Sequence, residues 1–273
     1  MSTSIMSGLG SSLNTLDRIR AAQSSSIQKI ATGSKYSSAA DGASDYAILQ
    51  RTYSNIGAVS QSNSNAQTSN AMLSTAAGAV NETVSSLSSL RSTLINASNG
   101  TNGTTDLSAL QKSVDQTIAA VNDNASVTYN GKQLLDGSQS LTVAGVDGYS
   151  TVSLGNMTSQ GLGLTDSEGK STINLTDSSS LSSALAKVDT ALGSALDQAT
   201  SIGAAQEGLS YQSSNYTTQE TALYSTASTQ GDTDIAAESV KLASSNTQEQ
   251  AALFAIKAGM QNMSQNMLSS IND

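Results

Sequence analysis

The chain has 273 residues, a formal net charge of −9 and a sequence pI near 4.3. Its Lys and Arg residues are scattered, so the sequence offers no cationic cluster of the kind that binds nucleic acid. Because it contains no His, Cys or Pro and only one Phe, it excludes His- or Cys-based catalytic groups and metal sites, disulfides, and a core built on large rings.

A heptad pattern predicts a long helix near the N-terminus. Alternating steps of three and four residues link Met6, Leu9, Leu13, Leu16, Ile27 and Ile30, with Arg20 and Gln23 at the two remaining positions. The segment shows no basic region followed by an apolar run, so we predict no cleavable secretory signal.

The interior predicts further helices with the same period. Apolar residues recur seven apart at Leu73, Val80, Leu87 and Leu94, and again at Leu107, Val114 and Val121. Between these two runs, the segment Ser98–Thr105 is a turn signal rich in Asn and Gly. A longer run extends from Leu181 to Leu223 in one register, with Asp177 or Ser178 as its predicted N-cap.

Residues 126–176 break the helical pattern. Tyr129-Asn130-Gly131-Lys132 predicts a turn, and Leu141–Ala144 and Tyr149–Leu154 alternate apolar and polar residues on either side of a Val-Asp-Gly turn. This alternation predicts a β-hairpin.

The C-terminal segment repeats the N-terminal spacing. Its stripe contains Leu253, Ile256, Met260, Met263, Met267 and Ile271. Neither stripe is wide enough to fold alone, so we expect the two to pair with each other or with copies from other subunits. The predicted fold is mainly α: a long antiparallel helical bundle or coiled coil with paired terminal helices and a small β-hairpin region. The predicted polymerisation seam consists of Leu9, Leu13, Leu16, Ile27, Ile30, Leu253, Ile256, Met260, Met263, Met267 and Ile271.

Other chemistry is weakly represented. The carboxylate pairs Asp41/Asp45 and Asp232/Asp234 lack an apolar pocket, so we interpret them as caps and surface charges. The heptad spacing of Met260, Met263 and Met267 favours a packing seam over a soft-metal site. We therefore expect no enzyme activity, no cofactor and no metal. The longest apolar stretch, Ala251–Ile256, is too short to cross a bilayer, so no membrane insertion is expected.

Several segments resemble the bacterial flagellin family. The stretch from Ile27 to Ile48 is similar to the family's N-terminal signature, in which a helix ends at a Thr-Gly-Ser-Lys turn and resumes after an Ala-x-Asp segment. Tyr129–Leu135 resembles the family's aromatic-Asn-Gly-x-x-Leu segment. Asp232–Ser239 and Gln265–Ile271 resemble its C-terminal region. The likeness covers both ends and most of the middle, in order.

The resemblance implies a structural subunit that self-assembles into the extracellular flagellar filament for swimming. Residues 1–45 plus 227–273 would form the inner core, and residues 46–226 the outer core. With only about 50 residues left for outer domains, a short form and a thin filament are expected. The implied partners are other copies of the chain, hook-associated and cap proteins, an export chaperone at the C-terminal helix, and the type III flagellar export apparatus. The alternatives are a hook–filament junction protein or another type III-exported axial filament protein.

Overall fold

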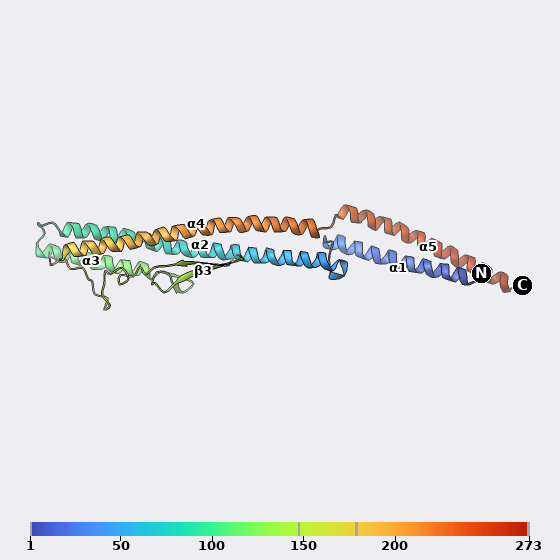
Figure 1. The fold of residues 1–273 in the computed structure, drawn as a ribbon, viewed down its shortest axis with the longest axis horizontal. Coiled ribbons are helices and arrows are strands. Elements are labelled where there is room, and N and C mark those ends of the chain that lie inside the picture. Colours follow the sequence, from blue (N-terminus) through green and yellow to red (C-terminus); the bar gives the residue numbers. More distant parts are fainter. Residues whose placement is uncertain (1, 147, 178–179, 272–273) are drawn as a thin grey trace. The chain divides into compact units, whose positions relative to one another are not determined.

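The computed structural model describes residues 2–146, 148–177 and 180–271, and within them long helices dominate. The chain divides into two compact units: residues 1–56 with 221–273, and residues 57–220. The helices are α1 (Ser2–Thr32), the short 3-10 helix η1 (Ala39–Asp41), α2 (Ala43–Ala97), α3 (Thr104–Ala125), α4 (Leu181–Gly231) and α5 (Ile235–Ile271) (Figure 1). A mainly α fold, as predicted, is confirmed.

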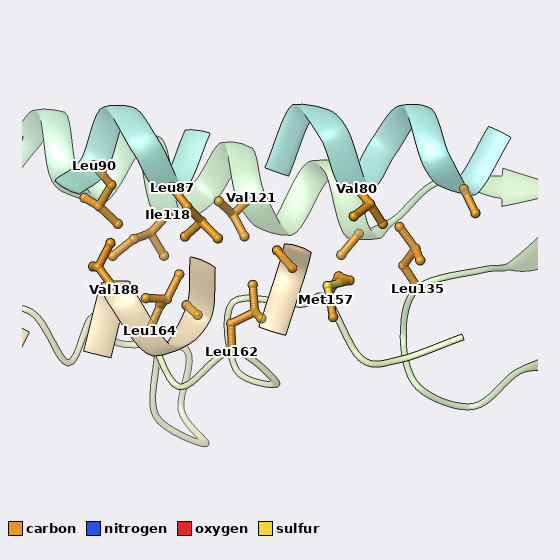
Figure 2. Close-up of a cluster of buried hydrophobic side chains, with 14 of the residues drawn as sticks. Val80, Leu87, Leu90, Ile118, Val121, Leu135, Met157, Leu162, Leu164 and Val188 are labelled. Atoms are coloured by element: carbon orange, nitrogen blue, oxygen red, sulfur yellow. The ribbon is translucent and has the colours of Figure 1, made fainter. Parts of the chain in front are cut away.

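The core of the second unit lies where α2, α3 and α4 pack against each other. The heptad residues Leu73, Val80, Leu87 and Leu94 of α2 are fully buried, as are Val114 and Val121 of α3. On α4, Val188 and Ile202 of the predicted run are also fully buried. Figure 2 shows Leu87, Ile118 and Val188 meeting in this core. The helices therefore bury the rows that the seven-residue spacing predicts.

The helix boundaries follow local sequence signals. Helix α2 ends at Ala97 and α3 begins at Thr104, so the predicted Asn- and Gly-rich break is confirmed. Gly103 precedes α3, and its N–H donates to the Asp106 carboxylate at 3.0 Å, which caps the helix. Helix α4 begins at Leu181, two or three residues later than the predicted N-cap implies; residues 178 and 179 lie outside the described part of the chain.

Two hairpins interrupt the helices. Strands β1 (Thr128–Tyr129) and β2 (Lys132–Gln133) pair across Asn130 and Gly131, whose φ angles of 50° and 77° are those of a type I′ turn. Strands β3 (Ser140–Gly145) and β4 (Gly148–Ser153) form the predicted longer hairpin, with antiparallel pairing throughout. Both hairpins belong to the second unit.

The segment after β4 packs onto the helices without regular structure. It buries Leu154, Leu164 and Leu175 completely. The side chain of Gln111 in α3 binds the C-terminal end of this segment. Its Nε2 donates to the Ile173 carbonyl at 3.1 Å, and the Leu175 N–H donates to its Oε1 at 2.8 Å. Together with the hairpins, this segment covers the core of the second unit.

In the first unit, the α1–α2 connection is joined to the α4–α5 connection by backbone hydrogen bonds. The Lys35 N–H donates to the Gly231 carbonyl at 2.6 Å, and the Thr233 N–H donates to the Gly33 carbonyl at 2.8 Å. Gly33 has φ of 67°, the left-handed conformation that commonly ends a helix. Gly231 lies against Leu49, and a Cβ there would stand 2.8 Å from the nearest Leu49 methyl carbon. These contacts fix where α1 ends and α5 begins.

The carboxylates singled out in the sequence act as local caps. Asp41 accepts hydrogen bonds from the backbone N–H groups of Ser37 and Ser38, which hold the pKa of its carboxyl below the ordinary value. Asp234 accepts from the N–H of Ala237 at the start of α5. Asp41 and Asp234 therefore act as caps, as the sequence predicts.

Candidate functional site

Helices α1 and α5 lie side by side and run antiparallel within the first unit (Figure 1). In each heptad of either helix, the partner helix shields two positions from solvent. We call these positions the inner seam; in α1 they are Leu9, Ser12, Leu16, Ile19, Gln23, Ser26 and Ile30, and in α5 they are Glu238, Leu242, Ser245, Glu249, Ala252, Ile256, Gly259 and Met263. Both sets alternate steps of three and four residues, which is the pattern of a coiled coil.

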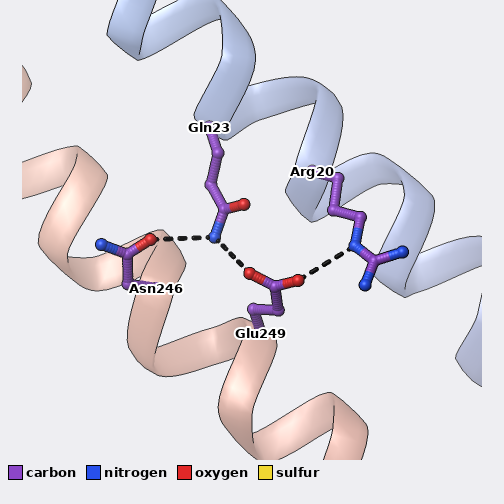
Figure 3. A network of polar contacts seen from close by, with 4 residues as sticks. All are labelled: Arg20, Gln23, Asn246 and Glu249. Carbon is purple, nitrogen blue, oxygen red and sulfur yellow. Dashed lines mark hydrogen bonds and ion pairs between the residues drawn. The ribbon is translucent and has the colours of Figure 1, made fainter.

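Polar side chains occupy the middle of the inner seam. Glu249 accepts from Arg20 Nε and from Gln23 Nε2, both at 2.9 Å, and Gln23 Nε2 also donates to Asn246 Oδ1 at 3.1 Å (Figure 3). Arg20, Gln23 and Glu249 therefore bridge the two helices, with a charge-assisted bond at each carboxylate oxygen.

A second carboxylate lies nearer the start of α5. Glu238 is buried, and its Oε1 accepts from the Ser26 hydroxyl at 2.7 Å while its Oε2 pairs with Lys241 Nζ at 3.0 Å. The Ser26 hydrogen bond, followed by that of Lys241, lowers the pKa of the Glu238 carboxyl. The hydrogen bond from Gln23, followed by that from Arg20, likewise lowers the pKa of Glu249. Both groups are therefore held in the ionised form.

The residues of the predicted polymerisation seam divide into two sets. Leu9, Leu16, Ile30, Ile256 and Met263 belong to the inner seam and are buried or half-buried. Leu13, Ile27, Leu253 and Met260 are exposed, with 48%, 55%, 43% and 55% of their surface accessible. We call these four residues the outer row. Met267 and Ile271 lie within α5, but their side chains fall outside the part of the chain that the structure describes.

The outer row lies along one side of the helix pair. Each of its residues follows an inner-seam position by one residue: Leu13 follows Ser12, and Leu253 follows Ala252. Because the helices are antiparallel, this position is on the same side of the pair in both helices. Helix α5 adds the exposed residues Phe254 and Leu268 in a neighbouring row. The result is an apolar side that no other described part of the first unit covers.

The opposite side of the pair is polar. A groove of about 560 Å³ runs there between α1 and α5, lined by small residues such as Ala22, Ser25 and Ser244 and by Lys29 and Gln248. The two sides of one helix pair thus differ in chemistry, one apolar and one hydrophilic. This difference favours association through the apolar side of the pair.

Most inner-seam residues lie outside the predicted seam, among them Ile19, Leu242 and Gly259. Ile19, Leu242 and Gly259 pack between the helices, and a Cβ on Gly259 would stand 3.8 Å from Leu9 Cδ1. Ile19 was detectable, because it continues the three- and four-residue steps from Leu16 to Gln23. Leu242 was detectable in the same way, since it lies seven residues before Glu249. The serines and glutamates between them concealed the row.

Comparison with known proteins gives a consistent result. The bacterial flagellin N-terminal helical region matches residues 6–140, and the bacterial flagellin C-terminal helical region matches residues 185–271. The chain is 33% identical over 132 residues to a flagellin from Clostridium tyrobutyricum, covering 48% of this chain and 35% of that one. It is 28% identical over 228 residues to the flagellar filament 30.7 kDa core protein of Treponema maltophilum, covering 78% of this chain and 80% of that one.

Coverage of the relatives is uneven. The matches to the flagellins of Clostridium tyrobutyricum and Serratia marcescens span 35% and 37% of those chains. Among solved structures, one assigned to a flagellar hook-associated protein from Vibrio parahaemolyticus aligns with a TM-score of 0.59 at 17% identity, covering 70% of this chain and 99% of that one. This last likeness concerns the fold alone. No helix in the described part of the chain is long and apolar enough to cross a membrane.

Proposed function

Because the chain belongs to the bacterial flagellin family, we propose that it is a non-catalytic subunit that self-assembles into the extracellular flagellar filament used for swimming. The observation that carries the proposal is the apolar side of the α1–α5 pair. Leu13, Ile27, Leu253 and Met260 face solvent together there, and Phe254 is 76% exposed beside them. This exposed apolar surface, which Arg20 and Asn246 interrupt at the middle of the pair, marks an interaction site.

A second copy of the chain is the partner that this surface fits best. Its apolar residues recur along both helices on either side of Arg20 and Asn246, so the surface favours a long partner of matching period rather than a small molecule. Contact between the apolar side of one pair and a different side of the next is heterologous, and a heterologous contact that does not close produces a helical filament. The proposed assembly therefore extends along the pair without limit.

The terminal pair is marginal in isolation. Ordering a residue costs about 1–2 kcal/mol of backbone entropy, and burying a full apolar side chain returns about 1.5–3 kcal/mol. The inner seam alternates apolar residues with Ser12, Gln23, Ser26 and their partners, so few positions provide the full return. We propose that the terminal pair opens readily in the free monomer and becomes stably ordered when a neighbouring copy covers the outer row.

The remaining assignments follow from this proposal. Residues 1–45 plus 227–273 form the inner core, residues 46–226 form the outer core, and the short chain gives a thin filament. Export proceeds through the type III flagellar apparatus with a chaperone at α5, and hook-associated and cap proteins bind the ends of the filament. The similarity to flagellins and to a filament core protein supports these roles.

The alternative is a hook–filament junction protein or another type III-exported axial filament protein. The fold likeness to a hook-associated protein is the observation in its favour. The family matches at both ends and the curated relatives named as flagellins favour a filament subunit.

Seeded assembly tests the proposal. Purified full-length chain is added to short filament fragments and observed by electron microscopy and sedimentation. We expect long fibres that grow with subunit concentration. Short rings or caps would support the junction protein instead, and a chain that stays monomeric with ordered, protected terminal helices would refute self-assembly.

A further inference from the structure

Polar groups in the inner seam contribute no more stability than apolar residues would at the same heptad positions. Glu238 and Glu249 occupy such positions, and each is bonded across the pair to α1. We propose that these two glutamates are the residues that fix the register of α1 against α5. The proposal rests on the filament function, because the register determines how the outer row is presented to the next copy.

The apolar part of the inner seam does not specify one register by itself. Leu9, Leu16 and Ile30 are alike in size and recur at multiples of seven residues on α1, and α5 presents Ile256 and Met263 seven apart. A shift of one heptad again places a leucine of α1 against a small residue of α5, Leu9 against Ala252 or Leu16 against Gly259, so these contacts alone do not select one register. Some other feature must select the observed alignment.

A shift in one direction places both carboxylates against aliphatic side chains. Glu249 lies opposite Gln23, and a one-heptad slip moves it opposite Leu16. The same slip moves Glu238 from its serine partner to Ile19. Glu249 then loses its cross-helix donors while remaining between the helices, which is costly for a charged group, and Glu238 keeps only Lys241 of its own helix.

A shift in the other direction is equally unfavourable. Glu249 then lies opposite Ile30, and Glu238 is moved to the level of Gly33, beyond the end of α1 at Thr32. The two glutamates are eleven residues apart and sit on different inner-seam rows, so no single slip satisfies both. Only the observed register provides Arg20 and the seam donors together.

The register has a direct consequence for the apolar side. In the observed alignment Leu9 meets Gly259 and Gln23 meets Glu249, so Leu13 lies level with the turn of α5 that contains Leu253. A slip of one heptad displaces the two halves of the apolar side along the pair by one heptad, about 10 Å at 1.5 Å per residue. A neighbouring copy built to the same period then meets a mismatched surface.

The absence of Cys from the sequence allows the register to be measured by engineered disulfides. The pair Leu9→Cys with Gly259→Cys reports the observed register. Leu9→Cys with Ala252→Cys, and Leu16→Cys with Gly259→Cys, report slips of one heptad in the two directions. A disulfide requires Cα atoms within about 7 Å, so each pair forms in one register alone.

Each cysteine pair is placed in the wild-type chain, in the double variant Glu238→Leu/Glu249→Leu, and in Glu249→Gln, which keeps an acceptor for Gln23. Lys257→Leu is the control for an added leucine on an exposed position of α5. We expect wild type, Glu249→Gln and Lys257→Leu to form only the disulfide of the observed register. The double variant should form the slipped disulfides at comparable yield, and its slipped fraction should fail to elongate seeds.

The outcomes separate the two proposals. If the wild type elongates seeds but the double variant forms only the disulfide of the observed register, the register role is wrong and the filament function stands. If the wild type forms all three disulfides, the register is not fixed and the inference is overturned. If the disulfides behave as expected but no variant elongates seeds, the filament function fails while the register role survives.

Discussion

The division of the predicted seam into an inner seam and an outer row can be tested with two leucines three residues apart on the same helix. Leu16 is 6% exposed and Leu13 is 48% exposed. Truncating a buried leucine to alanine costs about 2–5 kcal/mol, and we expect the lower end, about 2 kcal/mol, for Leu16→Ala because polar neighbours let the site collapse. That loss raises the rate of amide exchange in α1 and α5 about 30-fold.

Leu13→Ala should leave the isolated pair unchanged and weaken assembly. Docking of a neighbour removes about half of the leucine surface from water, worth about 1 kcal/mol of the ~1.5–3 kcal/mol for full burial. The critical concentration for seeded growth should therefore rise about fivefold. Asn14→Ala, an exposed polar neighbour in α1, is the control and should change neither quantity. Equal exchange rates in both leucine variants, or normal growth of Leu13→Ala, would contradict the division.

Three further predictions address the rest of the chain. Leu87→Ala, in the fully buried core of the second unit, should lower its free energy of unfolding by about 2–5 kcal/mol in urea titration. A Cβ at Gly145 would overlap the Tyr216 hydroxyl, so Gly145→Ala should destabilise by about 1–3 kcal/mol, and adding Tyr216→Phe should recover part of this in a double-mutant cycle. The pKa values of Glu238 and Glu249 are lowered in the folded pair. The stabilisation that these two carboxylates provide is therefore present above the ordinary glutamate pKa of about 4.3 and is lost as the pH falls through the lowered values. Amide exchange in α5 should accelerate in that acid range, and an unchanged rate would contradict the role of these bonds.

Much of the architecture was predictable because the period of the sequence is sustained. The run from Leu181 to Leu223 keeps one register for six heptads, and its main row is buried in the structure. The Asn-Gly pair at Asn130 and Gly131 predicted a turn, and the structure adds a two-residue ladder on each side of it. These features depend on local sequence, which is why they could be read without knowledge of the partners.

The orientation of the terminal helices was only half predictable. Leu13 and Ile19 satisfy similar heptad spacings from Leu16, and a periodic pattern identifies the helix without deciding which flanking row meets the partner. In the structure, polar residues select the row that faces the partner helix. Glu238 and Ser26 form a buried hydrogen bond at positions that the pattern treats as exposed. Polar residues in a seam are therefore the feature that simple hydrophobic spacing conceals.

The irregular segment after β4 was not predictable beyond its turns. Leu154, Leu164 and Leu175 are fully buried there, although their spacing follows neither a helix nor a strand. Their positions are set by contacts with α3, including the clamp from Gln111. Such burial depends on residues far away in the sequence, which no local period records.

The two units separate charge from apolar surface in a way that suits assembly. Residues 57–220 contain 5 Lys and Arg against 13 Asp and Glu, a net charge of −8 out of −9 for the whole chain. Like charges on neighbouring copies repel within the Debye length of about 10 Å at moderate salt, so the second unit keeps free subunits soluble and apart. The first unit is close to neutral and carries the apolar side, so association there meets little repulsion. The charge distribution therefore favours the proposed assembly through the terminal helices as much as the exposed leucines do.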